Sequence, residues 1–124
     1  MVKIKNGVSY DLNGWKYISV SGKPHERGFA YGYFCAKDFK NIQKMLTFFI
    51  YETYGVTWEY IVEEVQKSIK PKTIKYFKEF YDEMEGIVEG CIHGGTDTTI
   101  NEIIAWNFYC SLPYWISSID GNNN

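Results

Sequence analysis

Cys110, which Ser111 follows, is the side chain in this sequence best suited to nucleophilic chemistry. A cysteine nucleophile needs a base beside it and hydrogen-bond donors for the oxyanion, and the only two histidines are His25 and His93. A pair of Cys110 with His93 is one hypothesis, and a buried, unreactive thiol at position 110 is the interpretation that we favour. Side-chain types alone therefore indicate no complete catalytic apparatus, and we expect no catalytic residue in this chain.

Asn107 is the most informative residue for a binding role. In a helix it shares one face with Ile100, Ile103 and Cys110, and an unpaired amide among apolar neighbours would cost about 1–3 kcal/mol. We therefore expect Asn107 to be hydrogen-bonded to a specific partner. That partner is either a neighbouring loop or helix end, which we favour, or a loop of an active site.

Glu26 and Arg27 lie in the first turn of a predicted helix, where Arg27 has the geometry to bind a carboxylate with two hydrogen bonds. We favour a structural salt bridge that fixes the start of the helix, and a clamp for a substrate carboxylate is the alternative. The sequence contains no phosphate-binding loop, no dinucleotide fingerprint, no HExxH and no metal-ligand spacing of His, Cys or Asp. We accordingly expect no metal and no cofactor.

The elements that must position these residues are mostly helical. One strand is predicted over Trp15–Val20, where β-branched and aromatic residues lie between two glycines. A helix follows from Pro24, and its small residues Gly28, Gly32 and Ala36 recur every four positions. Since each glycine costs a helix roughly 0.8–1.0 kcal/mol, this spacing predicts close approach of another backbone. A loop through the same residues is the alternative.

Four further helices are predicted from apolar stripes and caps. The second ends at Gly55, and the third begins after Thr57. Pro71 separates the third from the longest helix, whose stripe and glycine pair are Ile74, Phe77, Tyr81, Met84, Gly86, Val88 and Gly90. Thr99 to Glu102 is a capping box that starts a fifth helix ending before Pro113. The predicted fold class is α+β, mostly helical with one N-terminal strand.

Composition limits the classes of protein. The 124 residues suffice for one core, so residues 1–124 are predicted to form a single unit, and the net charge of −2 argues against a nucleic-acid binder. Three widely spaced cysteines argue against a disulfide framework, so we interpret Cys35, Cys91 and Cys110 as buried thiols. The first residues lack the apolar core of a signal peptide, and no apolar run is long enough to span a membrane. A cytoplasmic location is the expectation.

Three blocks of sequence resemble one known family. They are GWKYISVSGKPHERGFAYGYFCAKDF at 14–39, EMEGIVEGC at 83–91 and EIIAWNFYCSLPYW at 102–115. In this order they resemble the N-terminal part of autoproteolytic cysteine amidohydrolases and acyltransferases related to isopenicillin N acyltransferase. That family belongs to the N-terminal-nucleophile hydrolases and is distantly similar to phospholipase B-like proteins.

The resemblance implies a four-layer αββα fold and an inactive precursor that cuts itself before a cysteine. That cysteine would begin a β chain and act as its nucleophile on a small substrate with a linear amide or other acyl bond. In this sequence only ISSIDGNNN follows the third block, so residues 1–124 are expected to be the α chain or a truncated N-terminal part. Cys110 lies at a position where the family pattern would not put its nucleophile.

For an α chain of this kind the resemblance places pocket walls on the fifth helix. The expected substrate-binding residues are Trp106, Asn107, Tyr109 and Cys110. Alone, such a chain is expected to be inactive. A helical binding or interaction module without chemistry, or an inactive truncated paralogue, is the alternative.

Overall fold

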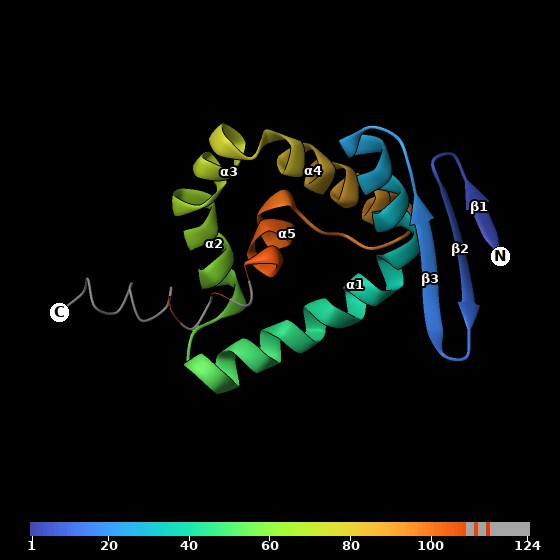
Figure 1. Ribbon diagram of the computed structural model, residues 1–124. Helices are drawn as coiled ribbons and strands as arrows, with labels where there is room; N and C mark the ends of the chain where they lie inside the picture. Colours follow the sequence, from blue (N-terminus) through green and yellow to red (C-terminus); the bar gives the residue numbers. More distant parts are fainter. Residues whose placement is uncertain (109–110, 112–113, 115–124) are drawn as a thin grey trace.

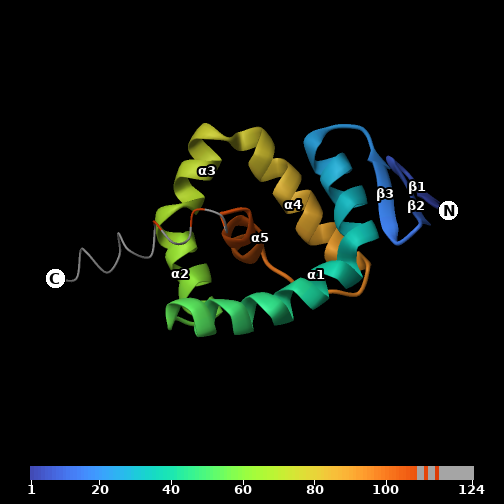
Figure 2. The same ribbon diagram turned by 60° about the horizontal axis from the view of Figure 1, so that its bottom comes forward.

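The computed structural model describes residues 1–108, 111 and 114. Within these residues, a small sheet lies at one end, five helices follow it, and the last helix is enclosed by the others (Figures 1 and 2). The prediction of a mostly helical α+β chain is confirmed. None of the helices in the described part combines the length and apolarity needed for a membrane-spanning segment.

The N-terminal sheet has three antiparallel strands in the order β1 (Val2–Ile4), β2 (Gly7–Leu12) and β3 (Trp15–Val20). The predicted strand at Trp15–Val20 is confirmed, but the prediction of a single strand is wrong. Asn13 and Gly14 both have positive φ (53° and 81°) and form the two-residue turn that lets β2 pair with β3. Asn6, with φ 69°, lies in the two-residue turn between β1 and β2.

Helix α1 (Pro24–Tyr54) joins into one element what the sequence analysis divides into two helices. No proline interrupts it, and it ends only where Gly55 adopts the left-handed conformation with φ 70°. The helix changes direction near its middle (Figures 1 and 2). In this region the buried hydroxyl of Thr96 donates a 2.6 Å hydrogen bond to the carbonyl of Ala36. A side chain inserted beside the backbone ladder in this way is a known cause of helix bending.

Helices α2 (Trp58–Ser68), α3 (Lys70–Tyr76) and α4 (Lys78–His93) follow. The prediction that one helix contains Ile74 and Val88 is wrong, because Phe77 leaves helical geometry (φ −134°, ψ 49°) and separates α3 from α4. As expected, Thr57 caps α2, and its hydroxyl accepts a hydrogen bond from the Tyr60 N–H. Pro71 lies in the first turn of α3.

The backbones of α1 and α4 touch through four glycines. A β-carbon on Gly28 would lie 2.0 Å from the carbonyl oxygen of Glu83, and one on Gly32 would lie 2.2 Å from that of Ile87. On the other side of the contact, Gly86 and Gly90 approach α1 carbonyls at 2.2 and 2.1 Å by the same measure. The predicted close backbone approach is confirmed, and the alternative of a loop is wrong. The glycine pairs are partners of one another within this chain.

One face of the sheet packs on the first half of α1. Gly7 lies against Ala30 and Phe34 of that helix, and Ile18 packs against the core. Lys16 forms an ion pair with Asp38 of α1. The sheet is therefore fixed to the helices through its inner face.

Candidate functional site

Helix α5 (Ile100–Asn107) carries the residues that the sequence analysis places nearest a site. Its cap is as predicted, because the hydroxyl of Thr99 accepts a hydrogen bond from the Glu102 N–H at 3.2 Å. Ile103, Ile104 and Ala105 are buried against the other helices. The helix thus forms part of the core, and its remaining side chains lie at the surface or border grooves.

Trp106 lies on the side of α5 that faces α1. Its ring meets the ring of Phe39 edge-to-face, with 4.6 Å between centroids. It also borders an apolar groove whose other lining residues are Ile42, Met45, Leu46 and Phe49. This half-buried indole forms one wall of the groove, and the described residues that line the groove carry no charged group.

Asn107 borders apolar side chains, as its helical position suggests, but it is not buried among them. The residue is exposed, and its amide donates a 2.8 Å hydrogen bond to the carbonyl of Ile103 in its own helix. The expectation of a partner in another loop or helix is therefore wrong, because the preceding turn satisfies the amide. Asn107 borders a second groove, lined mainly by α3 and α4, and so does not share a groove with Trp106.

The other predicted site residues differ in how far they can be placed. Tyr109 and Cys110 lie outside the described residues. The pairing of Cys110 with His93 therefore stays a hypothesis. His93 is exposed and meets the ring of Phe29 edge-on, with 5.2 Å between centroids. Arg27 forms salt bridges with Glu79 (3.0 Å) and Glu83 (3.2 Å), which confirms its structural interpretation.

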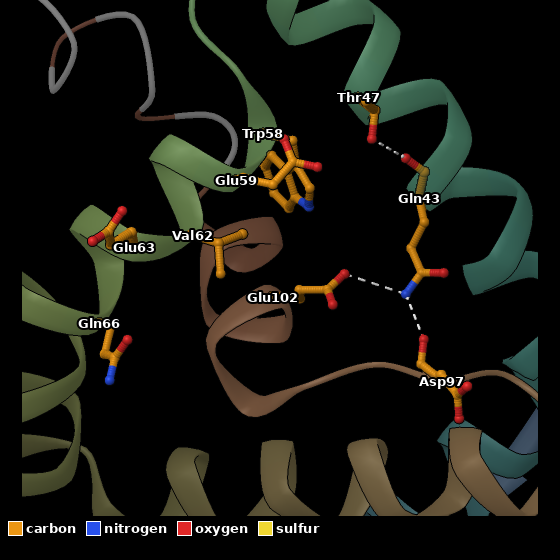
Figure 3. Close-up of a pocket in the computed structure, with 9 residues that line it drawn as sticks. All are labelled: Gln43, Thr47, Trp58, Glu59, Val62, Glu63, Gln66, Asp97 and Glu102. Atoms are coloured by element: carbon orange, nitrogen blue, oxygen red, sulfur yellow. Dashed lines mark hydrogen bonds between the residues drawn. The ribbon is translucent and has the colours of Figure 1, made fainter.

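A polar cavity between α1, α2 and α5 is the candidate site that sequence reasoning missed (Figure 3). It has a volume of about 440 Å³ and opens to the surface. Its floor is formed by Trp58 and Glu102, which come from α2 and α5. The rim and walls are Gln43, Thr47, Glu59, Val62, Glu63, Gln66 and Asp97.

Gln43 connects α1 with α5 and with the loop before α5 across the cavity. Its side-chain amide donates one hydrogen bond to the backbone carbonyl of Asp97 (2.9 Å) and one to the carboxylate of Glu102 (3.3 Å), as the dashed lines in Figure 3 show. The capping motif predicts that Glu102 reaches back to its own helix start. Its carboxylate instead points across the cavity to α1.

The electrostatics of the cavity are one-sided. Among the described residues, four carboxylates line it, and no Lys, Arg or His does. Glu63 approaches Lys67 at 3.7 Å, whereas Glu59, Asp97 and Glu102 have no ion pair within the part of the chain that the structure describes. Burial raises the pKa of Glu102, and the nearby charge of Glu59 raises it further, against the opposing effect of the nearby N–H groups of Trp58 and Gln43. The carboxylate on the cavity floor is thus short of positive charge.

Trp58 is the second polar group on that floor. Only 5% of the residue is exposed, and its indole N–H, although near Glu102, makes no hydrogen bond of normal geometry with the described residues. Buried indole N–H groups usually have a partner. The cavity therefore presents an indole donor without a hydrogen bond beside a carboxylate without an ion pair among the described residues.

Among the described residues no group of three or more His, Cys, Asp or Glu side chains is positioned to hold a metal ion. The two placed thiols, Cys35 and Cys91, are free and buried, as predicted.

Comparison with known proteins adds no assignment, since no family model, curated protein or solved structure matches the chain.

Proposed function

We propose that this chain is the non-catalytic helical part of a larger enzyme, an autoprocessed cysteine-nucleophile hydrolase or acyltransferase that acts on linear amide or other acyl bonds. The uncovered aromatic face of its sheet is the observation that carries the proposal. The resemblance of the three sequence blocks supplies the reaction class.

The outer face of the sheet has the composition of an interior. Tyr10, Leu12, Trp15 and Tyr17 alternate onto the side away from α1, and Trp15 is 70% exposed. The Tyr10 and Tyr17 rings stack across the β2–β3 pair with 5.2 Å between centroids. Antiparallel sheets commonly turn one face to water, but that face is usually polar. Exposed apolar patches bounded by polar residues often mark interaction sites.

We interpret this arrangement as one half of a four-layer αββα sandwich. Helices cover one face of the sheet, and the other face is of the type that packs on a second sheet about 10 Å away. The first two blocks that resemble the family also form one structural unit, because Gly28 and Gly32 of one block touch the Glu83 and Ile87 carbonyls of the other. Both features support a role as the first half of such a fold.

The thiols placed in this chain are unsuited to catalysis. Burial raises the pKa of Cys35, and burial with the neighbouring Cys35 raises the pKa of Cys91 to about 12. A thiol with so high a pKa supplies almost no thiolate at neutral pH. The proposed nucleophile is accordingly the amino-terminal cysteine of a partner β chain.

In the proposed reaction the α-amine of that cysteine, or a bridging water, takes the thiol proton. The thiolate attacks the substrate carbonyl, and N–H donors stabilise the oxyanion. Collapse of the tetrahedral intermediate expels the leaving group, which takes up the proton, and leaves a thioester. Water or an amine then accepts the acyl group and releases the thiol.

Intact-mass analysis of the protein made from its full native reading frame, first under native and then under denaturing conditions, tests the proposal. We expect a partner chain that begins with cysteine and separates only on denaturation. Within that complex, Trp15→Glu should weaken the association, whereas Tyr76→Glu, at a similarly exposed aromatic on α3, should not. A native mass equal to this chain or a multiple of it would refute the proposal.

A non-catalytic helical binding module is the second candidate. The glycine pairs and the sheet strands are paired within this chain, so much of its structure needs no second chain. A cooperative thermal transition of a soluble monomer would favour the module. A requirement for a second chain to obtain folded protein would exclude it.

A further inference from the structure

We propose that the cavity between α1, α2 and α5 binds a primary ammonium group that has a neutral carbonyl oxygen close to it. The Glu102 carboxylate would accept hydrogen bonds from the ammonium group, and the Trp58 indole N–H would donate to the carbonyl oxygen. This inference is independent of the proposed enzyme, because it concerns only residues of the cavity.

The charge of the cavity selects a cation. Glu59, Asp97 and Glu102 face the same space without an ion pair in the described part of the chain, and Lys67 meets Glu63 only at the rim. A half-buried carboxylate with a raised pKa gains most from a cation that enters beside it, because the cation replaces the solvation that burial removed. An anionic ligand would meet like charge from α2, α5 and the loop before α5.

The shape of the charge distribution favours an organic cation over a metal ion. The carboxylates come from α2, α5 and the loop before α5, and they are not gathered into a set of three metal ligands. An alkylammonium group has three donors that can be shared among separated acceptors. Gln43 holds the Glu102 carboxylate in place for this role through its 3.3 Å hydrogen bond.

The indole of Trp58 requires the ligand to carry a hydrogen-bond acceptor as well as a cation. It lines the cavity with its N–H unpaired and with 95% of the residue covered, so the donor has little access to bulk water. A carbonyl oxygen accepts such a hydrogen bond without bringing negative charge next to Glu102. A ligand with both groups thus satisfies the two polar atoms of the floor together.

Glycinamide is the probe, since its ammonium and amide carbonyl are two bonds apart. Ethylamine lacks the carbonyl, and acetamide lacks the cation. We would titrate the chain with each probe at constant ionic strength and follow the Trp58 indole N–H resonance by NMR. Glycinamide should bind more tightly than ethylamine, and acetamide should leave the resonance unmoved. Equal affinity for glycinamide and acetamide would overturn the role of charge.

Three variants separate the contributions. Glu102→Gln keeps a hydrogen-bond acceptor for Gln43 and should weaken glycinamide binding about tenfold or more. Glu59→Gln at the exposed rim should weaken it less. Glu85→Gln, an exposed change of the same charge on α4, should leave it unchanged. If Glu102→Gln and Glu85→Gln have the same effect, the cavity is not the site.

Trp58→Phe, followed by the shifts of backbone amides around the cavity, tests the indole donor. It should reduce the affinity for glycinamide to that for ethylamine and leave ethylamine binding unchanged. Unchanged preference for glycinamide in this variant would overturn the assignment of the indole. If the variant does not fold, equal affinities for glycinamide and ethylamine in the unaltered chain would overturn it in the same way.

Discussion

Replacing Gly28 by alanine tests whether the contact of α1 with α4 depends on backbone approach. The added β-carbon would lie 2.0 Å from the carbonyl oxygen of Glu83 and 2.9 Å from its carbonyl carbon. The closest ordinary C–H···O contacts are about 3.3 Å, so the helices would have to part by about 1.3 Å. No side-chain rotation relieves the clash, because both atoms of the partner belong to the backbone.

The magnitude follows from two opposing effects. In a helix interior, alanine is more favourable than glycine by roughly 0.8–1.0 kcal/mol. Inserting a methyl group into a closely packed contact typically costs about 1–3 kcal/mol, and backbone clashes lie at the upper end of that range. We therefore expect Gly28→Ala to lower the free energy of unfolding by about 1–2 kcal/mol.

The assay is urea unfolding followed by circular dichroism and tryptophan fluorescence. The matched control compares Lys40→Gly with Lys40→Ala at an exposed position of the same helix, where alanine should be the more stable by roughly 1 kcal/mol. The order of glycine and alanine should therefore reverse between positions 40 and 28. A more stable Gly28→Ala chain would refute the reasoning.

A double variant examines the same contact from both sides. A β-carbon on Gly86 would lie 2.2 Å from the His25 carbonyl oxygen, almost as close as the 2.0 Å of Gly28 to that of Glu83. Once one alanine has parted the helices, the second should cost less. The loss in Gly28→Ala/Gly86→Ala should thus be smaller than the sum of the single losses, as expected for neighbouring sites. Strict additivity would contradict a shared contact.

Three further outcomes are expected. Thr96→Val leaves the α1 carbonyl that it bonds without this partner and should lower the free energy of unfolding by about 1–3 kcal/mol in urea; an equal loss in Thr96→Ser would contradict the role of the hydroxyl. Burial raises the pKa of Glu102, so the folded chain holds the carboxyl proton more tightly than the unfolded chain does. The free energy of unfolding should therefore fall as the pH rises above about 4.3. Urea titrations of Glu102→Gln should show a weaker fall. In a Cys110→Ser chain, Cys91, with a pKa raised to about 12, should be about 10⁻⁴ thiolate at pH 8, and both it and Cys35 should react with a thiol reagent only after unfolding; fast labelling of native protein would show that the thiols are accessible.

Local signals predicted the helical part of the fold well. The glycine spacing in α1 and α4 predicted a close helix contact, because no other residue lets two backbones approach so closely. Thr57 and Thr99 indicated two helix starts through their capping hydroxyls. Continuity was harder to predict. The bend in α1 lies beside a hydrogen bond from distant Thr96, which no local pattern contains.

The missed strands did have a signal. Asn13-Gly14 is a favoured dipeptide for a two-residue hairpin turn, and Val8, Tyr10 and Leu12 alternate with polar residues before it. Their pattern is misleading in one respect, since these apolar side chains face away from α1 and the inner positions are Gly7 and Ser9. Strand existence was therefore predictable, but the covered face was not.

The polar cavity could not be predicted in the same way. Gln43, Trp58 and Glu102 belong to three helices and come together only because α5 lies between the others. Asn107 shows the opposite error, because its helical face predicted burial whereas its amide bonds the preceding turn. Periodicity reports which face of a helix is apolar and does not report which polar side chains from other helices will meet it.

The interlocked glycines of α1 and α4 also limit how this sequence can diverge. Surface helices accept many substitutions, but here any side chain at four positions would collide with a main chain that has no room to give way. Descendants of this sequence that keep the helix pair should therefore retain two glycine pairs, each with three residues between its members, even where every other trace of common ancestry has been lost. That spaced pattern is a criterion by which distant kinship with this chain can be recognised.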